Sequence, residues 1–247
     1  MDVTRVPPAV RDLAERLDGL GWVTELLVAG SLATGDYVPG VSDLDLVALT
    51  AGPVGPARQE ALAALHRELD QGPAAGLDLG CAYVDADRLA DPGALHPTWT
   101  HGSVVQRSLS GVTRAELVRH GFAVLGRPPA ALLPEMTDDD VRAAARAELC
   151  GYWAYASRRP LWWLSPVIAD LGLTAMARGR YALRTGQLLT KTQAVEQAHA
   201  PAWLKNQLRA RRRGQPVTSP PVRTALIAWW DARRTVAAAR RSRPPAT

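Results

Sequence analysis

The chain has 247 residues, enough for one large domain or two small ones, and 47% of them are hydrophobic, which suffices for a substantial core. No apolar run reaches the roughly 18–20 residues that a membrane-spanning helix needs, and the first eight residues lack a signal peptide's apolar segment. We therefore expect a cytoplasmic protein with no membrane partner, and its net charge of +5 does not by itself indicate nucleic-acid binding.

The first predicted functional segment is a glycine turn that follows a buried strand. Residues 10–20 have helical apolar spacing, and residues 22–29 are typical of a strand. Gly30 interrupts this strand and allows the backbone to approach another group closely. From Ser31 the chain can open a short helix, whose free amides favour an anion.

A pair of carboxylates follows this turn on a second predicted strand, residues 43–49. Side chains alternate along a strand, so Asp43 and Asp45 project from one face and the intervening leucines from the other. Two carboxylates beside a phosphate cradle suit a Mg²⁺ ion that is held against the phosphates of a nucleotide. The residues Gly30-Ser31-x-Ala33-x-Gly35, then Ser42-Asp43-x-Asp45, resemble the signature of the polymerase-β-like nucleotidyltransferases.

A third acid lies in the next predicted strand, residues 77–84. It follows an amphipathic helix over residues 57–69, on which we expect His66 to be a surface residue. Asp78 is surrounded by apolar residues, and a lone acid there is costly unless it has a partner or a function. If this strand pairs beside Asp43 and Asp45, Asp78 completes a triad that binds metal or takes the proton of an attacking hydroxyl. The alternative is an acid at a strand end in water.

The rest of the chain predicts a change of architecture near residue 134. Residues 96–102 carry Trp99 and two histidines, and they fit either a substrate-facing loop or an ordinary turn. A helix over residues 114–120 and a strand over 122–125 complete a mixed-sheet domain, residues 1–133. Only helical patterns follow, in a domain of residues 134–247. The expected fold class is therefore α+β: a polymerase-β-like nucleotidyltransferase domain followed by an all-α helical bundle.

The helical half carries a second resemblance. Leu173-Thr174, Ala177-Arg178 and Tyr181, with residues 185–191, resemble the C-terminal domain of the aminoglycoside (3'')/(9) adenylyltransferases, the streptomycin and spectinomycin resistance enzymes. This resemblance implies Mg²⁺-dependent transfer of AMP from ATP to a hydroxyl of an aminoglycoside or aminocyclitol, in a cleft between the domains, for which a monomer suffices. The residues that it implies in nucleotide binding are Gly30, Ser31, Ser42, Asp140, Arg178 and Lys191, with Mg²⁺ on Asp43 and Asp45.

The sequence departs from that family in two places. The catalytic base of the family is a glutamate where this chain has Asp78, and the tryptophan and aspartate that contact streptomycin have no clean counterpart. The acceptor therefore stays open. A cationic acceptor needs acids or aromatic rings around it, and the candidates are Asp78, Trp99, Glu148, Trp162 and Trp163.

Two other functions remain open. The same chemistry can act on a protein hydroxyl or an RNA end, and basic residues at 209–213 and 240–241 could attract phosphates. Aromatic residues are not interleaved with these arginines, which argues against a nucleic-acid partner. The remaining alternative is a non-catalytic sensor that binds ATP without turnover.

Overall fold

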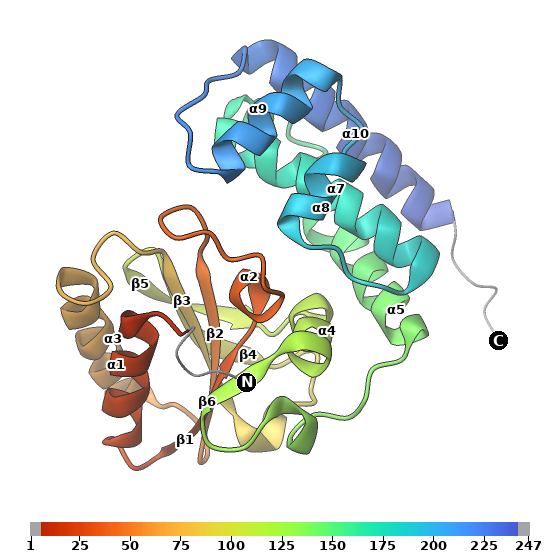
Figure 1. Ribbon diagram of the computed structural model, residues 1–247. Helices are drawn as coiled ribbons and strands as arrows, with labels where there is room; N and C mark the ends of the chain where they lie inside the picture. Colours follow the sequence, from red (N-terminus) through yellow and green to blue (C-terminus); the bar gives the residue numbers. More distant parts are fainter. Residues whose placement is uncertain (1–5, 242–247) are drawn as a thin grey trace. The chain divides into compact units, whose positions relative to one another are not determined.

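The computed structural model describes residues 6–241, and the chain divides into two compact units, Met1–Glu135 and Met136–Thr247 (Figure 1). The boundary predicted between residues 133 and 134 lies within two residues of this division. The first unit combines a mixed sheet with helices and the second is helical, which confirms the predicted fold class.

The first unit contains six strands and four helices, with short 3₁₀ turns at Ala86–Arg88 and Pro129–Ala131 among the described residues. In chain order its main elements are α1 (Pro8–Asp18), β1 (Val23–Val28), α2 (Gly30–Ala33), β2 (Leu44–Thr50), α3 (Pro56–Gln71), β3 (Leu79–Asp85), β4 (Leu95–Thr100), β5 (Ser103–Ser108), α4 (Gly111–His120) and β6 (Phe122–Leu125).

The sheet has the strand order β5-β4-β3-β2-β1-β6. Strands β2 and β3 run parallel, joined by the crossover helix α3, and the other neighbouring pairs are antiparallel. A parallel pair needs such a crossover, because the chain must return to the same edge before the second strand begins. As a result, β2 and β3 both begin at the same edge of the sheet.

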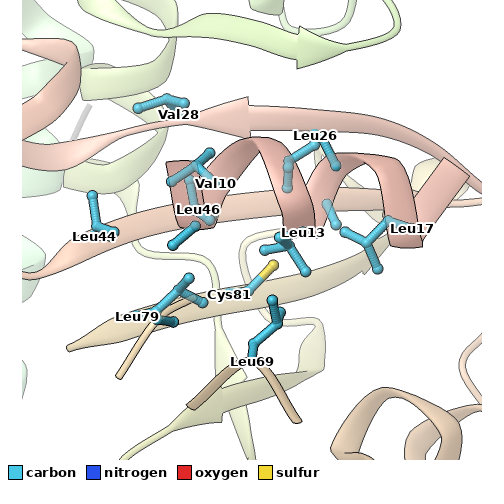
Figure 2. Packing of buried hydrophobic residues seen from close by; sticks show 14 of the residues in the cluster. Val10, Leu13, Leu17, Leu26, Val28, Leu44, Leu46, Leu69, Leu79 and Cys81 are labelled. Atoms are coloured by element: carbon cyan, nitrogen blue, oxygen red, sulfur yellow. The ribbon is translucent and has the colours of Figure 1, made fainter. Parts of the chain in front are cut away.

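Apolar side chains cover both faces of this sheet. On one face, the alternate residues Leu44 and Leu46 of β2 pack with Leu13 of α1 and Leu69 of α3, as Figure 2 shows. On the other face, Val47 and Leu49 are buried in a second cluster that includes residues of α4. Because side chains alternate along β2, the polar side chains at its start project from the same face as Val47 and Leu49.

Two predictions about this unit were wrong. Residues 96–102, expected to be a loop or turn, contribute most of β4, which forms a hairpin with β5. His66, expected on the surface, is fully buried: its Nε2 lies 2.7 Å from the hydroxyl of Tyr83, and its ring stacks on Trp99 with centroids 4.9 Å apart. His66 lies on the buried stripe of α3 with Leu62 and Leu69, and its partners are on β3 and β4.

The second unit is a bundle of helices. Its elements are α5 (Asp138–Glu148), a π-helical turn (Leu149–Trp153), α6 (Ala154–Ala156), a 3₁₀ turn (Pro160–Leu164), α7 (Pro166–Thr185), α8 (Lys191–Gln197), α9 (Ala202–Arg212) and α10 (Pro221–Arg241). Helix α7 packs against α5, α8 and α10. Within the described residues, no helix combines the length and the apolar character that crossing a membrane requires.

Local chemistry explains where these helices begin and end. Thr137 and Thr190 each accept a hydrogen bond from the backbone N–H three residues later, in capping boxes that start α5 and α8. Gly186 ends α7 with φ of +72°, a left-handed conformation that glycine adopts without a steric penalty.

Candidate active site

The glycine turn after β1 is built around a close contact between Gly30 and Asp45. Gly30 has φ of +60°, and a β-carbon added to it would lie 2.0 Å from Asp45 Oδ2. The backbone N–H of Ala29 donates to the carbonyl of Asp45 at 2.9 Å, which extends the β1–β2 pairing to this point. The turn therefore needs glycine for both its backbone conformation and the space that the Asp45 carboxylate occupies.

Two buried serines support the turn. The hydroxyl of Ser31, at the start of α2, lies 3.5 Å from the carbonyl oxygen of Asp43. The hydroxyl of Ser42 accepts a hydrogen bond from the backbone N–H of Val38 at 3.0 Å, which fixes the loop that leads into β2. Both side chains thus lie beside the carboxylate segment, where the sequence predicted them.

The three predicted acids lie at one edge of the sheet. In the parallel β2–β3 pair, Asp45 lies opposite Gly80, and the N–H of Leu44 donates to the carbonyl of Asp78 at 2.8 Å. Asp43 and Asp78 therefore occupy neighbouring positions, one residue before the start of their strands. The strand pairing on which the triad argument depended is present, and Gly80 leaves space beside Asp45.

Asp78 also has a neighbour that the sequence did not assign to the site. The Nδ1 atom of His101 lies 3.7 Å from Asp78 Oδ1, and both side chains are more than half exposed. His101 and Gly102 form the turn between β4 and β5, and His101 has φ of +48° there. The turn places the imidazole of His101 beside Asp78. The only sequence signal is the Thr-His-Gly run, which is a common turn pattern.

The acidic character of this edge affects a nearby carboxyl group. Burial raises the pKa of Asp70. The charge of Asp78 reinforces this shift, and a hydrogen bond with Trp99 opposes it. Asp70 lies at the end of α3, the helix that connects the two carboxylate strands.

The second unit brings together the two predicted phosphate-binding cations. The Nε of Arg178, on α7, donates to the carbonyl of Leu189 at 3.0 Å, two residues before Lys191. Thr190 caps α8, and Lys191 is the first residue of that helix. A short capped turn thus holds both cations in one region of this unit.

Asp140 has a structural role at the start of α5. Its Oδ2 accepts hydrogen bonds from the backbone N–H and the hydroxyl of Thr137, at 2.8 and 2.7 Å. These hydrogen bonds hold the pKa of Asp140 below its usual range. The carboxylate therefore completes the N-terminal cap of α5, and its role near a nucleotide stays a prediction.

Two of the five acceptor candidates are core residues. Trp99 is 2% exposed and stacks on His66, whereas Trp163 is fully buried and donates its Nε1–H to the carbonyl of Ala156 at 3.1 Å. A buried ring has no face left for a ligand, so the prediction that these two tryptophans contact an acceptor was wrong.

The other candidates in the second unit are accessible. Trp162 is 41% exposed, packs edge-on to Tyr155 with centroids 5.6 Å apart, and has the Arg159 guanidinium 5.4 Å from its centroid. Glu148 is half-buried and lies 3.4 Å from the indole nitrogen of Trp153. Trp162 presents an aromatic face that already attracts a cation.

The carboxylate edge suits a hard divalent cation. Among residues 6–241 there is no cluster of three or more histidine, cysteine or acidic side chains that could enclose a metal ion. Mg²⁺ does not need such a cage, because it is usually bound by one or two carboxylates, with water and substrate phosphates as its remaining ligands. Asp43 and Asp45 fit this requirement.

Comparisons with known proteins agree with this geometry. Residues 9–79 match the family model described as a nucleotidyltransferase domain, a range that contains the glycine turn and all three acids. This part of the first unit is therefore similar to a nucleotidyltransferase domain. No curated protein matches the sequence.

Solved structures extend the likeness to the whole chain. The crystal structure of the spectinomycin adenyltransferase AAD(9) from Enterococcus faecialis, with ATP and spectinomycin, matches with a TM-score of 0.69 and 16% identity. The match covers 92% of this chain and 98% of that one. At this identity the comparison establishes a shared fold.

Proposed function

We propose that the protein transfers AMP from ATP to a hydroxyl of a small cationic acceptor of the aminoglycoside or aminocyclitol class. The observation that carries this proposal is the edge of the sheet where Asp43, Asp45 and Asp78 lie beside the glycine turn. The matched nucleotidyltransferase domain and the fold shared with a spectinomycin adenyltransferase support the same chemistry.

The first-unit residues have distinct roles in this proposal. Asp43 and Asp45 hold Mg²⁺, which when bound offsets phosphate charge and polarises the phosphoryl group. The turn at Gly30 and Ser31 positions the phosphates through backbone amides and the serine hydroxyl. Because Gly30 has no side chain, the Asp45 carboxylate can lie against the main chain of this turn.

The reaction is an in-line displacement at the α-phosphorus of ATP. Asp78 accepts the proton of the acceptor hydroxyl, and the acceptor oxygen forms a bond to the α-phosphorus. The bond from that phosphorus to the oxygen bridging to the β-phosphorus breaks, and pyrophosphate leaves with the electron pair. Arg178 and Lys191 offset the charge of the leaving pyrophosphate.

Asp78 is also suited to a cationic acceptor. Its side chain is 58% exposed, so an acceptor hydroxyl can reach it, and a carboxylate attracts the ammonium groups of an aminocyclitol. His101, 3.7 Å away, provides a second group that can exchange a proton with Asp78. In the second unit, the exposed ring of Trp162 is the aromatic candidate for contact with the acceptor.

A Mg²⁺-dependent assay of pyrophosphate release tests the proposal. The wild type is incubated with ATP and a panel of acceptors that includes spectinomycin, streptomycin and other aminocyclitols. We expect release with at least one compound, its loss in Asp43→Asn, and no change in the control Asp18→Asn, an exposed acid at the end of α1. Release in Asp43→Asn equal to the wild type would contradict the assigned role of the acid.

Substitution of Asp78 separates the base from the metal ligands. Asp78→Asn should lower kcat at least a hundredfold while Mg²⁺·ATP binding is retained, because general-base catalysis contributes about 10²–10⁴-fold. Asp78→Glu should retain measurable activity, because the carboxylate is preserved. ATP binding without release across the panel would instead favour a macromolecular acceptor or a sensor.

A further inference from the structure

The two units differ strongly in charge. Residues 136–247 contain 19 lysines and arginines against 7 aspartates and glutamates, whereas residues 1–135 contain 10 against 17. One bound triphosphate needs a few cations and does not account for such a surplus in the helical unit. A strongly basic half of a chain is typical of a protein that meets a polyanion.

Part of this surplus of positive charge lies on the exposed face of α10, which we call its outer face. Its exposed residues recur at helical spacing, and five of them are arginines: Arg223, Arg233, Arg234, Arg240 and Arg241. The one acid of this helix, Asp231, is buried. In the part of the chain that the structure describes, no carboxylate forms an ion pair with any of these five arginines, whereas Arg209 and Arg211 on α9 pair with Glu196 and Asp170.

Aromatic rings are interleaved with these arginines. Trp230 is 49% exposed on the same face, and the guanidinium of Arg233 lies 5.0 Å from the ring centroid of Trp229 and 5.6 Å from that of Trp230. The guanidinium of Arg223 lies 4.9 Å from the ring of Trp203, on α9. The sequence argument against a nucleic-acid partner concerned the arginines at 209–213 and 240–241, and it did not consider Arg223 and Arg233.

A hollow of about 410 Å³ lies beside Trp230. It is lined by His199, Leu226, Ile227, Trp230, Asp231 and Arg234. The Oδ1 of Asp231 accepts from Arg180 Nη1 at 2.6 Å and lies 3.4 Å from His199 Nδ1. The Asp231 side chain is buried, so the accessible wall of the hollow includes the exposed ring of Trp230.

We propose that the outer face of α10 binds single-stranded nucleic acid, with a base stacked on Trp230 at the hollow and the phosphates on the arginines. Stacking on an exposed indole needs an unpaired base, since the faces of paired bases are covered within a duplex. Arg223 to Arg241 spans about 27 Å along α10, room for several nucleotides. This proposal is independent of adenylyl transfer.

An anionic lipid surface is the competing partner, because basic helices with exposed tryptophan also bind membranes. The hollow favours nucleic acid. A flat lipid surface does not enter a recess, whereas an unpaired base has a planar face that can lie in the hollow against the ring of Trp230.

The test is a fluorescence anisotropy titration of the full chain with labelled 12-nucleotide oligouridylate and oligothymidylate, in excess Mg²⁺·ATP so that the nucleotide site is filled. We expect both single strands to bind, and a 12-base-pair duplex to bind more weakly. Trp230→Ala should weaken binding roughly tenfold and Trp230→Phe should retain it, because base stacking needs only a ring.

A charge-matched pair of variants separates a specific face from general attraction. Arg233→Gln/Arg234→Gln should flatten the slope of log affinity against log salt by about 1.4, since each phosphate contact on a single strand contributes about 0.7. The control Arg11→Gln/Arg67→Gln removes the same charge from exposed positions of the first unit and should leave the slope unchanged. A thermal unfolding midpoint equal to that of the wild type would show that each variant is folded.

Four results would each overturn the proposal: an equal effect of the control pair, no effect of Trp230→Ala, loss of oligonucleotide binding when ATP is added, or binding to phosphatidylglycerol vesicles without binding to oligonucleotides. None of these measurements uses pyrophosphate release, so failure here is distinguishable from failure of the proposed transferase activity.

Discussion

The contact between Gly30 and Asp45 gives the sharpest test of the candidate active site. In Gly30→Ala, the new β-carbon would lie 2.0 Å from Asp45 Oδ2 and 2.8 Å from its carboxyl carbon. Ordinary van der Waals contact begins at 3.4 Å, so the carboxylate oxygen must move by about 1.4 Å or the turn must open. A displacement of that size at a metal ligand should cost about a hundredfold in kcat/KM, as misplacements of about 1 Å do elsewhere.

The same substitution also strains the backbone, and a control separates the two effects. Gly30 has φ of +60°, and alanine in that region costs about 1–2 kcal/mol. Gly35 has φ of +72°, but a β-carbon there would meet nothing within 4 Å. Gly35→Ala should therefore lose a similar amount of stability, measured by chemical denaturation, and keep its Mg²⁺·ATP affinity.

Calorimetric titration with Mg²⁺·ATP, followed by pyrophosphate release where an acceptor is known, measures the effect. We expect Gly30→Ala to resemble Asp43→Asn in Mg²⁺·ATP affinity and pyrophosphate release. Gly35→Ala should equal the wild type in both. If Gly30→Ala and Gly35→Ala bind Mg²⁺·ATP equally well, the argument that Gly30 makes room for the Asp45 carboxylate is refuted.

The remaining predictions concern stability. Burial lowers the pKa of His66 to about 3, against about 6.5 when unfolded, so only the unfolded state takes up this proton between those values. The contribution of His66 to the free energy of unfolding should fall by about 1.4 kcal/mol per pH unit below pH 6.5, and denaturation at several pH values should show a shallower pH dependence in His66→Gln than in the wild type. Gly172→Ala would place a β-carbon 2.3 Å from the Trp163 ring and should lower the free energy of unfolding by about 1–3 kcal/mol, whereas Gly151→Ala, which meets open space, should not; equal unfolding midpoints would contradict the packing. Trp163→Ala should cost about 3–5 kcal/mol and exposed Trp162→Ala less than about 1 kcal/mol, while Trp162→Ala should raise KM for the acceptor; the reverse order would exclude Trp162 as the accessible ring.

The sequence predicted the parts of the site that depend on neighbouring residues. Gly30 indicates a close approach of the backbone, and the alternation around Asp43 and Asp45 indicates a shared face. Each of these features follows from the conformational preferences of a few consecutive residues, which sequence patterns record directly.

It predicted less where packing between distant segments decides the outcome. The side chains of Trp162 and Trp163 are adjacent in sequence, yet only Trp163 fills the space over Gly172. His66 is buried because Tyr83 and Trp99 supply its contacts from other strands. The apolar stripe of α3 includes position 66, but the groups that a histidine meets there come from distant strands. The pair of tryptophans gives no sign of which ring is buried.

The sequence by itself thus determined the two-part architecture, the phosphate-type turn and the carboxylate pair. Only the tertiary structure decided that β3 lies beside β2 with Asp78 next to Asp43, that His101 reaches Asp78, and that the arginines and Trp230 of α10 share one exposed face beside a hollow. The physical reason is that local preferences fix periodicity and caps, whereas strand neighbours, burial and surface clusters depend on contacts between residues far apart in the chain.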